Sequence, residues 1–186
     1  SAVSSKKRRI AFDSGMQIVE LVRQNICSSD IITKDTLRNA IICDLAMGGS
    51  TNSFLHILAI ANAGGIDVTL KDFEELSHKI HQVVKLDPAA APTMSDFHKA
   101  GGVPALLKTL TSANIGIKDH NTVSGLKISE ISKEAYVNTA LIHPYNEPFT
   151  TKPRLGILYG NLATEGCVTK ISGIDPSCYE FEGVAK

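Results

Sequence analysis

Two apolar stretches joined by a glycine pair most constrain the fold of this chain. Residues 41–47 read Ile-Ile-Cys-Asp-Leu-Ala-Met, residues 54–61 read Phe-Leu-His-Ile-Leu-Ala-Ile-Ala, and Gly48-Gly49 lies between them. Each stretch is apolar on nearly every side of a helix, which is typical of a helix packed inside a larger body. Two such helices are difficult to cover within 186 residues, so we expect this chain to be an internal segment of a longer protein.

Composition and charge exclude several classes of protein. Nineteen basic residues balance nineteen acidic ones and 43% of the residues are hydrophobic, which is typical of a globular protein and not of a polyanion binder. The basic cluster at residues 6–9 has no interleaved aromatic residues, so we expect no nucleic-acid partner. The longest apolar stretch, residues 54–66, is interrupted by His56 and Asn62 and is too short for a membrane span, so we expect no membrane partner.

The four cysteines carry no metal-finger or redox spacing. Cys27, Cys43, Cys167 and Cys178 form no C-x-x-C pair. The sequence shows no secretory signal pattern, which favours a reducing compartment. We therefore expect reduced thiols, no metal site made by this chain alone, and a cytoplasmic location or, in a eukaryote, an organelle matrix.

Helical periodicity dominates the first two thirds of the chain, and β-type residues and prolines dominate the last third. The patterns predict helices over residues 10–25 and 33–47 and a third that starts at Ser50 or Thr51, runs through Ala61 and is ended by Gly64-Gly65. Further helix starts are predicted at Thr69, Thr93 and Pro104. Short runs of β-type residues predict strands at residues 122–123, 126–128, 155–159 and 167–171. We place a boundary between domains 1–140 and 141–186, and we expect an α/β protein whose present segment is α+β.

The loop Gly48-Gly49-Ser50-Thr51-Asn52 is the main candidate binding site. The first backbone N–H groups of a helix lack intrahelical partners, and the helix dipole adds partial positive charge, so this helix start could hold an anion without Lys or Arg. Glycines would allow a ligand to approach closely. The alternative is an ordinary N-cap in which Ser50 or Thr51 satisfies its own helix, and spacing alone favours that alternative.

Three titratable residues lie near this loop or near a second glycine pair. Asp44 precedes the loop by about one helical turn within an apolar run, where an unpaired carboxylate would be costly, so we expect it to brace the loop. His56 follows the loop by about one turn, and His98 lies near Gly101-Gly102. A single histidine on an apolar helix is more often a core residue than a general base, and we interpret both histidines in that way.

Six stretches, taken in order, resemble the dihydroxy-acid dehydratase family, which includes phosphogluconate dehydratase. They are residues 14–21 (SGMQIVEL), 46–53 (AMGGSTNS), 55–61 (LHILAIA) with the turn 65–67 (GID), 96–104 (DFHKAGGVP), 143–148 (HPYNEP) and 160–166 (GNLATEG). Each motif alone is weak, but the set in register is specific and spans nearly the whole chain. His143 stands where the family usually has Arg, and Thr164 where it usually has Pro.

The resemblance implies the mostly helical part of an α/β/α domain followed by the first strands of a β-barrel-like domain. It implies a homodimeric hydro-lyase that removes water from a dihydroxy acid in branched-chain amino-acid biosynthesis, with an iron–sulfur cluster and Mg²⁺ as cofactors. The family's cofactor ligands and catalytic residues match no position here, so we expect none in this segment, and we expect the segment alone to be inactive. Only the loop carries over, with Gly49, Ser50, Thr51 and Asn52 as a wall of the substrate cavity.

Two alternatives remain open from the sequence. The full-length protein could be a sugar-acid dehydratase such as phosphogluconate dehydratase, because the motifs do not distinguish the two substrates. The chain could also be a non-catalytic anion-binding or scaffold module that has kept the family's helices without its chemistry.

Overall fold

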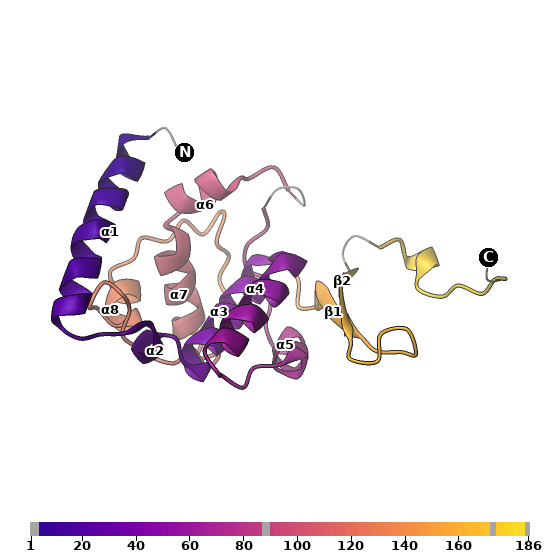
Figure 1. Cartoon of the computed structure of the whole chain (residues 1–186). Helices are drawn as coiled ribbons and strands as arrows, with labels where there is room; N and C mark the ends of the chain where they lie inside the picture. Colours follow the sequence, from indigo (N-terminus) through magenta and orange to yellow (C-terminus); the bar gives the residue numbers. More distant parts are fainter. Residues whose placement is uncertain (1–3, 87–89, 172–173, 185–186) are drawn as a thin grey trace.

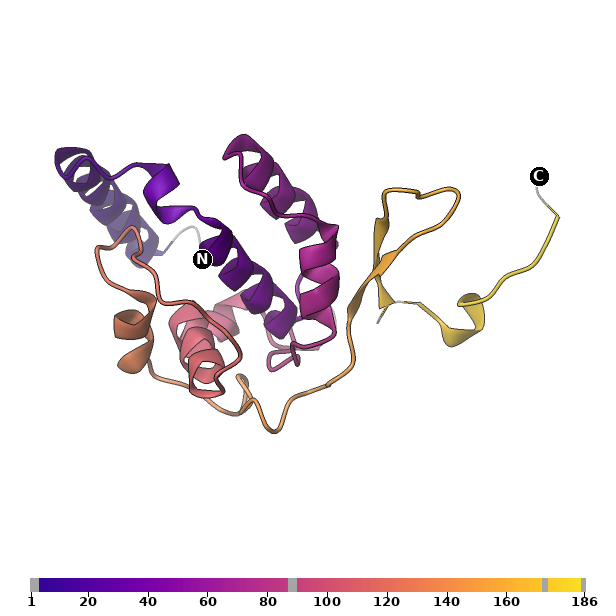
Figure 2. The same ribbon diagram turned by 90° about the horizontal axis from the view of Figure 1, so that it is seen from below.

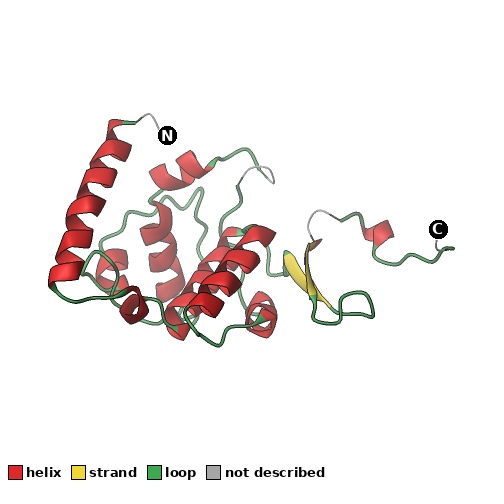
Figure 3. Cartoon of the chain, in the orientation of Figure 1, coloured by secondary structure: helices red, strands yellow, loops and turns green. Residues whose placement is uncertain are grey.

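The computed structural model describes residues 4–86, 90–171 and 174–184. A body of helices is followed by a two-stranded sheet and an extended C-terminal stretch (Figures 1 and 3). The helices are α1 (Ser5–Arg23), α2 (Ser28–Ile31), α3 (Lys34–Met47), α4 (Thr51–Ala63), α5 (Leu70–Ser77), α6 (Met94–Lys99), α7 (Gly102–Ser112) and α8 (Ile128–Lys133). The strands are β1 (Leu155–Leu158) and β2 (Cys167–Lys170), and a 3-10 helix follows at η2 (Pro176–Cys178).

Local capping explains where several helices begin. Thr33, Thr69 and Thr93 are the N-caps of α3, α5 and α6, as the sequence predicts. At Thr93 the backbone N–H donates to Asp96 Oδ2 at 3.0 Å, so the acidic side chain pairs a backbone donor that the helix leaves free. Pro104 lies in the first turn of α7, where its missing N–H costs no hydrogen bond.

The core lies around α3, which contacts both α4 and α5. Ile41, Ile42 and Ala46 of α3 are at most 1% exposed, and the remaining residues of the predicted apolar run 41–47 are buried or half-buried. The first half of the same helix is more open, because Lys34, Asp35 and Ala40 are exposed. Phe54 of α4 stacks on Phe73 of α5 with ring centroids 4.1 Å apart. The same hydrophobic cluster also contains buried side chains from other parts of the chain, among them Leu37, Leu76, Val83, Val84, Leu106, Leu110, Ile142 and Leu155.

Other apolar faces are open to solvent. Figures 1 and 2 show α1 at one edge of the helical body and the β1–β2 hairpin at the opposite edge. On α1, Phe12 and Val22 are 69% and 71% exposed, and Leu21 is the one residue of the helix classed as buried. On α4, Leu55 is 69% exposed. Apolar side chains of α1 and α4 therefore remain exposed to solvent in this chain.

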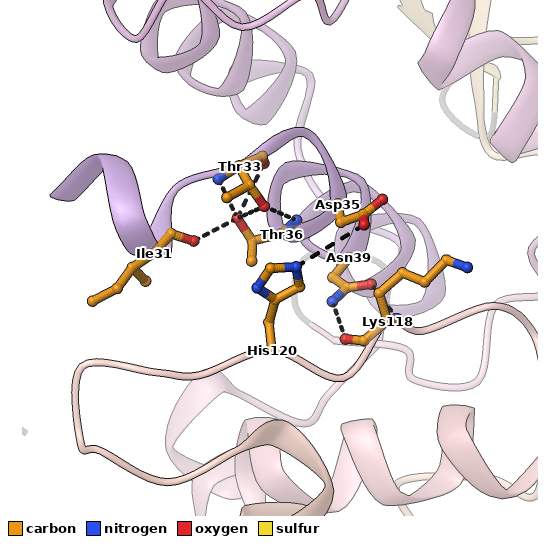
Figure 4. Close-up of polar contacts among 7 residues, drawn as sticks. All are labelled: Ile31, Thr33, Asp35, Thr36, Asn39, Lys118 and His120. Atoms are coloured by element: carbon orange, nitrogen blue, oxygen red, sulfur yellow. Dashed lines mark hydrogen bonds and ion pairs between the residues drawn. The ribbon is translucent and has the colours of Figure 1, made fainter. Parts of the chain in front are cut away.

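A buried amide joins α3 to a distant loop (Figure 4). Asn39, which is 5% exposed, donates from Nδ2 to the Lys118 carbonyl at 2.8 Å, and its Oδ1 accepts from the Lys118 N–H at 2.9 Å. In the same loop, His120 Nε2 lies 4.0 Å from Oδ2 of Asp35, which is also on α3. The loop after α7 is thus held against α3 by two hydrogen bonds that pair its backbone.

Two of the four predicted strands are correct. β1 and β2 pair antiparallel from Leu155 opposite Lys170 to Leu158 opposite Cys167. The predicted strands at 122–123 and 126–128 are wrong, because these residues form a turn closed by an isolated bridge between Asn121 and Lys127. Helix α8 then starts at Ile128, since the Lys127 N–H donates to Glu130 Oε2 at 2.7 Å as a cap. Helices with one small antiparallel sheet agree with the α+β prediction for this segment.

Candidate functional site

The glycine loop ends α3 and starts α4. Gly48 adopts a left-handed conformation (φ 66°), and its N–H donates to the Leu45 carbonyl at 3.0 Å. The Gly49 N–H donates to the Asp44 carbonyl at 2.9 Å, so the last turn of α3 closes as a Schellman motif. Ser50 is the N-cap of α4, and its Oγ accepts from the Asn52 N–H at 3.2 Å. The predicted N-cap is therefore present.

Asp44 braces this loop, as the sequence predicts. Its Oδ2 accepts from the Ser53 hydroxyl at 2.7 Å, and its carboxylate also accepts from the backbone N–H of Ser50. Burial raises the pKa of the Asp44 carboxyl above its ordinary value, whereas these hydrogen bonds and the positive charge of Lys170 act in the opposite direction. One carboxylate thus connects the end of α3 to the first turn of α4.

Both glycines of the loop are packed against polar side chains. A Cβ on Gly49 would lie 1.9 Å from Asp44 Oδ1, and a Cβ on Gly48 would lie 2.0 Å from Gln82 Nε2. Gln82 is 5% exposed and bonds Arg154, whose Nε donates to Gln82 Oε1 at 2.8 Å. The sequence analysis missed Ser53, Gln82 and Arg154. Ser53 could have been found as the third residue after the Ser50 cap, whereas the other two carry no local signal.

The predicted binding residues lie together on the first turn of α4. Ser50 and Asn52 are exposed, and Gly49 and Thr51 are partly buried. Thr51 and Asn52 line a groove of about 360 Å³ that continues over Leu55, Leu70 and Val168. The Ser50 and Asn52 N–H groups already have partners within the chain, in Asp44 and the Ser50 hydroxyl. Anion binding by Gly49–Asn52 therefore stays a prediction.

A second groove, of about 460 Å³, lies beside the loop. It is lined by Asp44 and Ser53 together with Cys43, Asn39 and the apolar residues Ile57, Val103 and Leu107. Burial raises the pKa of the Cys43 thiol to about 12, and the negative charge of Asp44 acts in the same direction. At neutral pH this sulfur is a protonated thiol, which is a poor nucleophile and a poor metal ligand.

Neither histidine lies in the core, so the interpretation of both as core residues is wrong. His56 is exposed because it shares the open face of α4 with Leu55, and His98 is exposed on α6, where its Nε2 lies 3.0 Å from Lys6 Nζ. Both face solvent in this segment, and neither has a hydrogen-bonding or ion-pair contact to the glycine loop among the described residues.

The described residues show no cluster of side chains of the kind that holds a metal ion. Across residues 4–86, 90–171 and 174–184, no three His, Cys, Asp or Glu side chains come close enough to hold a metal ion. Cys27, Cys167 and Cys178 are exposed free thiols that belong to separate parts of the fold. Within the same ranges, no helix has the length and hydropathy needed to cross a bilayer.

Comparison with known proteins identifies the family. The family model described as dihydroxy-acid/6-phosphogluconate dehydratase N-terminal matches residues 1–131, and the corresponding C-terminal model matches residues 140–186. A dihydroxy-acid dehydratase of Methanococcus aeolicus is 43% identical over 100% of this chain and 34% of its own length. Proteins of the same name from Clostridium novyi and Thermodesulfovibrio yellowstonii are 41% and 42% identical over 97% and 100% of the chain. The chain thus spans about a third of the length of these relatives, and it belongs to the dihydroxy-acid/6-phosphogluconate dehydratase family.

Proposed function

We propose that this chain is part of a dihydroxy-acid dehydratase, a hydro-lyase that converts a 2,3-dihydroxy acid to a 2-keto acid in branched-chain amino-acid biosynthesis. The observation that carries the proposal is identity of 41–43% along the chain to relatives that bear this name. The family description also includes 6-phosphogluconate dehydratases. The names of these relatives favour the dihydroxy acid as substrate over the phosphorylated sugar acid.

In this proposal the glycine loop is one wall of the substrate cavity. Ser50 and Asn52 present a hydroxyl and an amide at the N-terminus of a helix of 13 residues, where the dipole favours negative charge. Asp44 and Ser53 hold the backbone of that wall from behind. The substrate carboxylate or hydroxyl groups would meet the exposed side chains, and the brace would keep the wall from moving as substrate binds.

The cofactors belong to the proposal for the full-length protein. The resemblance implies an iron–sulfur cluster and Mg²⁺, but the described residues gather no ligand set for either. We propose that the ligands and the catalytic base come from other parts of the full-length protein. On the same basis we propose a homodimer in the cytoplasm or an organelle matrix, and a β-barrel-like domain that includes β1 and β2.

Activity of the full-length protein tests the proposal. The purified protein is reconstituted anaerobically with iron, sulfide and Mg²⁺ and offered a branched 2,3-dihydroxy acid, 6-phosphogluconate and other sugar acids. We expect 2-keto acid to form fastest from the branched dihydroxy acid. Preference for 6-phosphogluconate would support the alternative dehydratase, and no keto acid from any substrate would refute both. Calorimetric titration of the present chain with phosphate and 2-keto acids tests the non-catalytic module, which predicts binding without any other part of the protein.

A further inference from the structure

Gln82 is a buried polar residue whose side chain is hydrogen-bonded at both ends. It lies between α5 and α6, outside any helix or named strand, and is 5% exposed. Its Nε2 donates to the Val84 carbonyl at 2.7 Å, and its Oε1 accepts from Arg154 Nε at 2.8 Å. Since a buried amide is stable only when its groups are paired, these two bonds fix the orientation of the Gln82 side chain.

The fixed amide is packed directly on the start of the glycine loop. The Gln82 Nε2 atom occupies the position next to Gly48 where a Cβ would lie only 2.0 Å away. The adjoining backbone holds the same helix end, because the Val83 and Val84 N–H groups lie 2.8 and 3.2 Å from the Ala46 carbonyl of α3. Residues 82–84 therefore contact both the last turn of α3 and Gly48, directly before Gly49–Asn52.

The other side of Gln82 is tied to the segment that leads into β1. The Gln82 N–H donates to the Thr150 carbonyl at 3.0 Å, and the Phe149 N–H donates to the Gln82 carbonyl at 2.9 Å. Arg154 directly precedes β1 and belongs to the part matched by the C-terminal family model, whereas Gln82 and the glycine loop belong to the N-terminal one. One side chain thus joins both matched regions at the loop.

We infer that Gln82 and Arg154 are positioning residues that couple the glycine loop to the segment entering β1. Arg154 orients the Gln82 amide, and the amide in turn supports Gly48 and the loop that follows. The inference deepens the proposed function, since its catalytic consequence rests on the loop being a wall of the substrate cavity. Its structural consequence, a loop held by Arg154 through Gln82, does not depend on which reaction the protein catalyses.

Hydrogen exchange and kinetics of the full-length protein test the inference together. Arg154→Met removes the donor to Gln82, Arg154→Lys keeps a cation that can reach Gln82 Oε1, and Lys152→Met is the matched control because Lys152 is exposed two residues away. In Arg154→Met we expect about tenfold faster amide exchange in peptides covering residues 48–53. We also expect KM for the dihydroxy acid to rise about tenfold while kcat changes less than KM, because a displaced wall weakens substrate positioning.

The same measurements define the supporting and the contradicting outcomes. Three outcomes would support the inference that Arg154 acts on the loop through Gln82. Arg154→Lys would partly restore slow exchange and a low KM, and Lys152→Met would change neither. The double variant Gln82→Met/Arg154→Met would have an effect no larger than that of the stronger single variant. A lower melting temperature with unchanged exchange at residues 48–53 would show that Arg154 is merely structural and would overturn the inference. Faster exchange with unchanged KM would overturn its catalytic half. If the wild-type protein dehydrates none of the acids, the proposed function fails, and exchange alone still decides whether Arg154 positions the loop.

Discussion

Replacing Gly49 by Ala should loosen the glycine loop by a predictable amount. The new Cβ would lie 1.9 Å from Asp44 Oδ1 and 2.4 Å from its carboxyl carbon, a separation that no real Cβ contact tolerates. Gly49 does not need a left-handed conformation, so the clash with Asp44 is the main cost. The carboxylate must move, and it then loses the Ser53 hydroxyl and the Ser50 N–H as donors.

The free-energy cost of Gly49→Ala follows from the two hydrogen bonds that Asp44 loses, those from the Ser53 hydroxyl and the Ser50 N–H. Each hydrogen bond to a charged group contributes about 1.5–3 kcal/mol, and hydration of the displaced carboxylate offsets part of the loss. We therefore expect the loop to open more easily by about 2–4 kcal/mol, which corresponds to amide exchange faster by about 30-fold or more at one decade per 1.36 kcal/mol. In the same assay, Gly15→Ala on α1 should not destabilise its helix, because a Cβ there meets nothing within 4 Å and alanine is the better helix former by about 1 kcal/mol.

A double-mutant cycle separates the clash from other effects of Gly49→Ala. Peptides covering residues 44–53 of the full-length protein are followed by native-state hydrogen exchange in the wild type, Gly49→Ala, Asp44→Ala and the double variant. With Asp44 truncated the clash disappears, so adding Gly49→Ala should cost less than about 0.5 kcal/mol. Equal costs of Gly49→Ala in both backgrounds would refute the argument that Asp44 packs against this glycine and braces the loop.

Three further predictions concern the buried polar groups near α3. Iodoacetamide at pH 8 should modify Cys43 most slowly of the four cysteines, because a pKa of about 12 leaves only about one thiol in ten thousand ionised, and peptide mass spectrometry gives the order. Asn39→Leu should destabilise the fold by about 2–4 kcal/mol, because it leaves the Lys118 N–H and carbonyl unpaired, and hydrogen exchange around Lys118 should report the loss. Because the pKa of Asp44 is raised, the folded state binds the Asp44 proton more readily than the unfolded chain does. The free energy of unfolding of the wild type, relative to Asp44→Asn, should therefore be highest at acidic pH and fall as the pH rises through the folded-state pKa. A relative stability that increases over the same range in chemical denaturation would contradict this sign.

Local signals in the sequence predict most of the helices and the centre of the candidate site. The caps at Thr33, Thr69 and Thr93 depend on residues within one turn, so they can be recognised without the tertiary structure. The brace by Asp44 is also local, because Asp44 and Ser53 are separated by nine residues across one short loop. The bracing role of Asp44 could therefore be predicted from its place in an apolar run beside the loop, although its partner Ser53 on α4 was missed.

The wrong strand predictions and the missed contact between Gln82 and Arg154 have different causes. The runs at 122–123 and 126–128 contain residues that favour strands, but the turn at Gly125 (φ 81°) and the Glu130 cap of α8 outweigh that preference. The link between Gln82 and Arg154 spans 72 residues and joins two irregular segments, so no periodicity or cap indicates it. The sequence resemblance identifies the loop that matters, but only the packing shows what supports it from the side of β1.

The two neighbouring glycines of the loop differ in how mutations there could be tolerated during evolution. Gly49 is restricted by a single side chain, so a substitution there can be compensated by a shorter residue in place of Asp44. Gly48 is restricted by Gln82 and also by its own left-handed backbone, which a compensating change elsewhere cannot relieve. Position 49 can therefore vary together with position 44, whereas substitution at position 48 requires both a change at Gln82 and a residue that tolerates the left-handed region, as Asn does at Asn25 and Asn114.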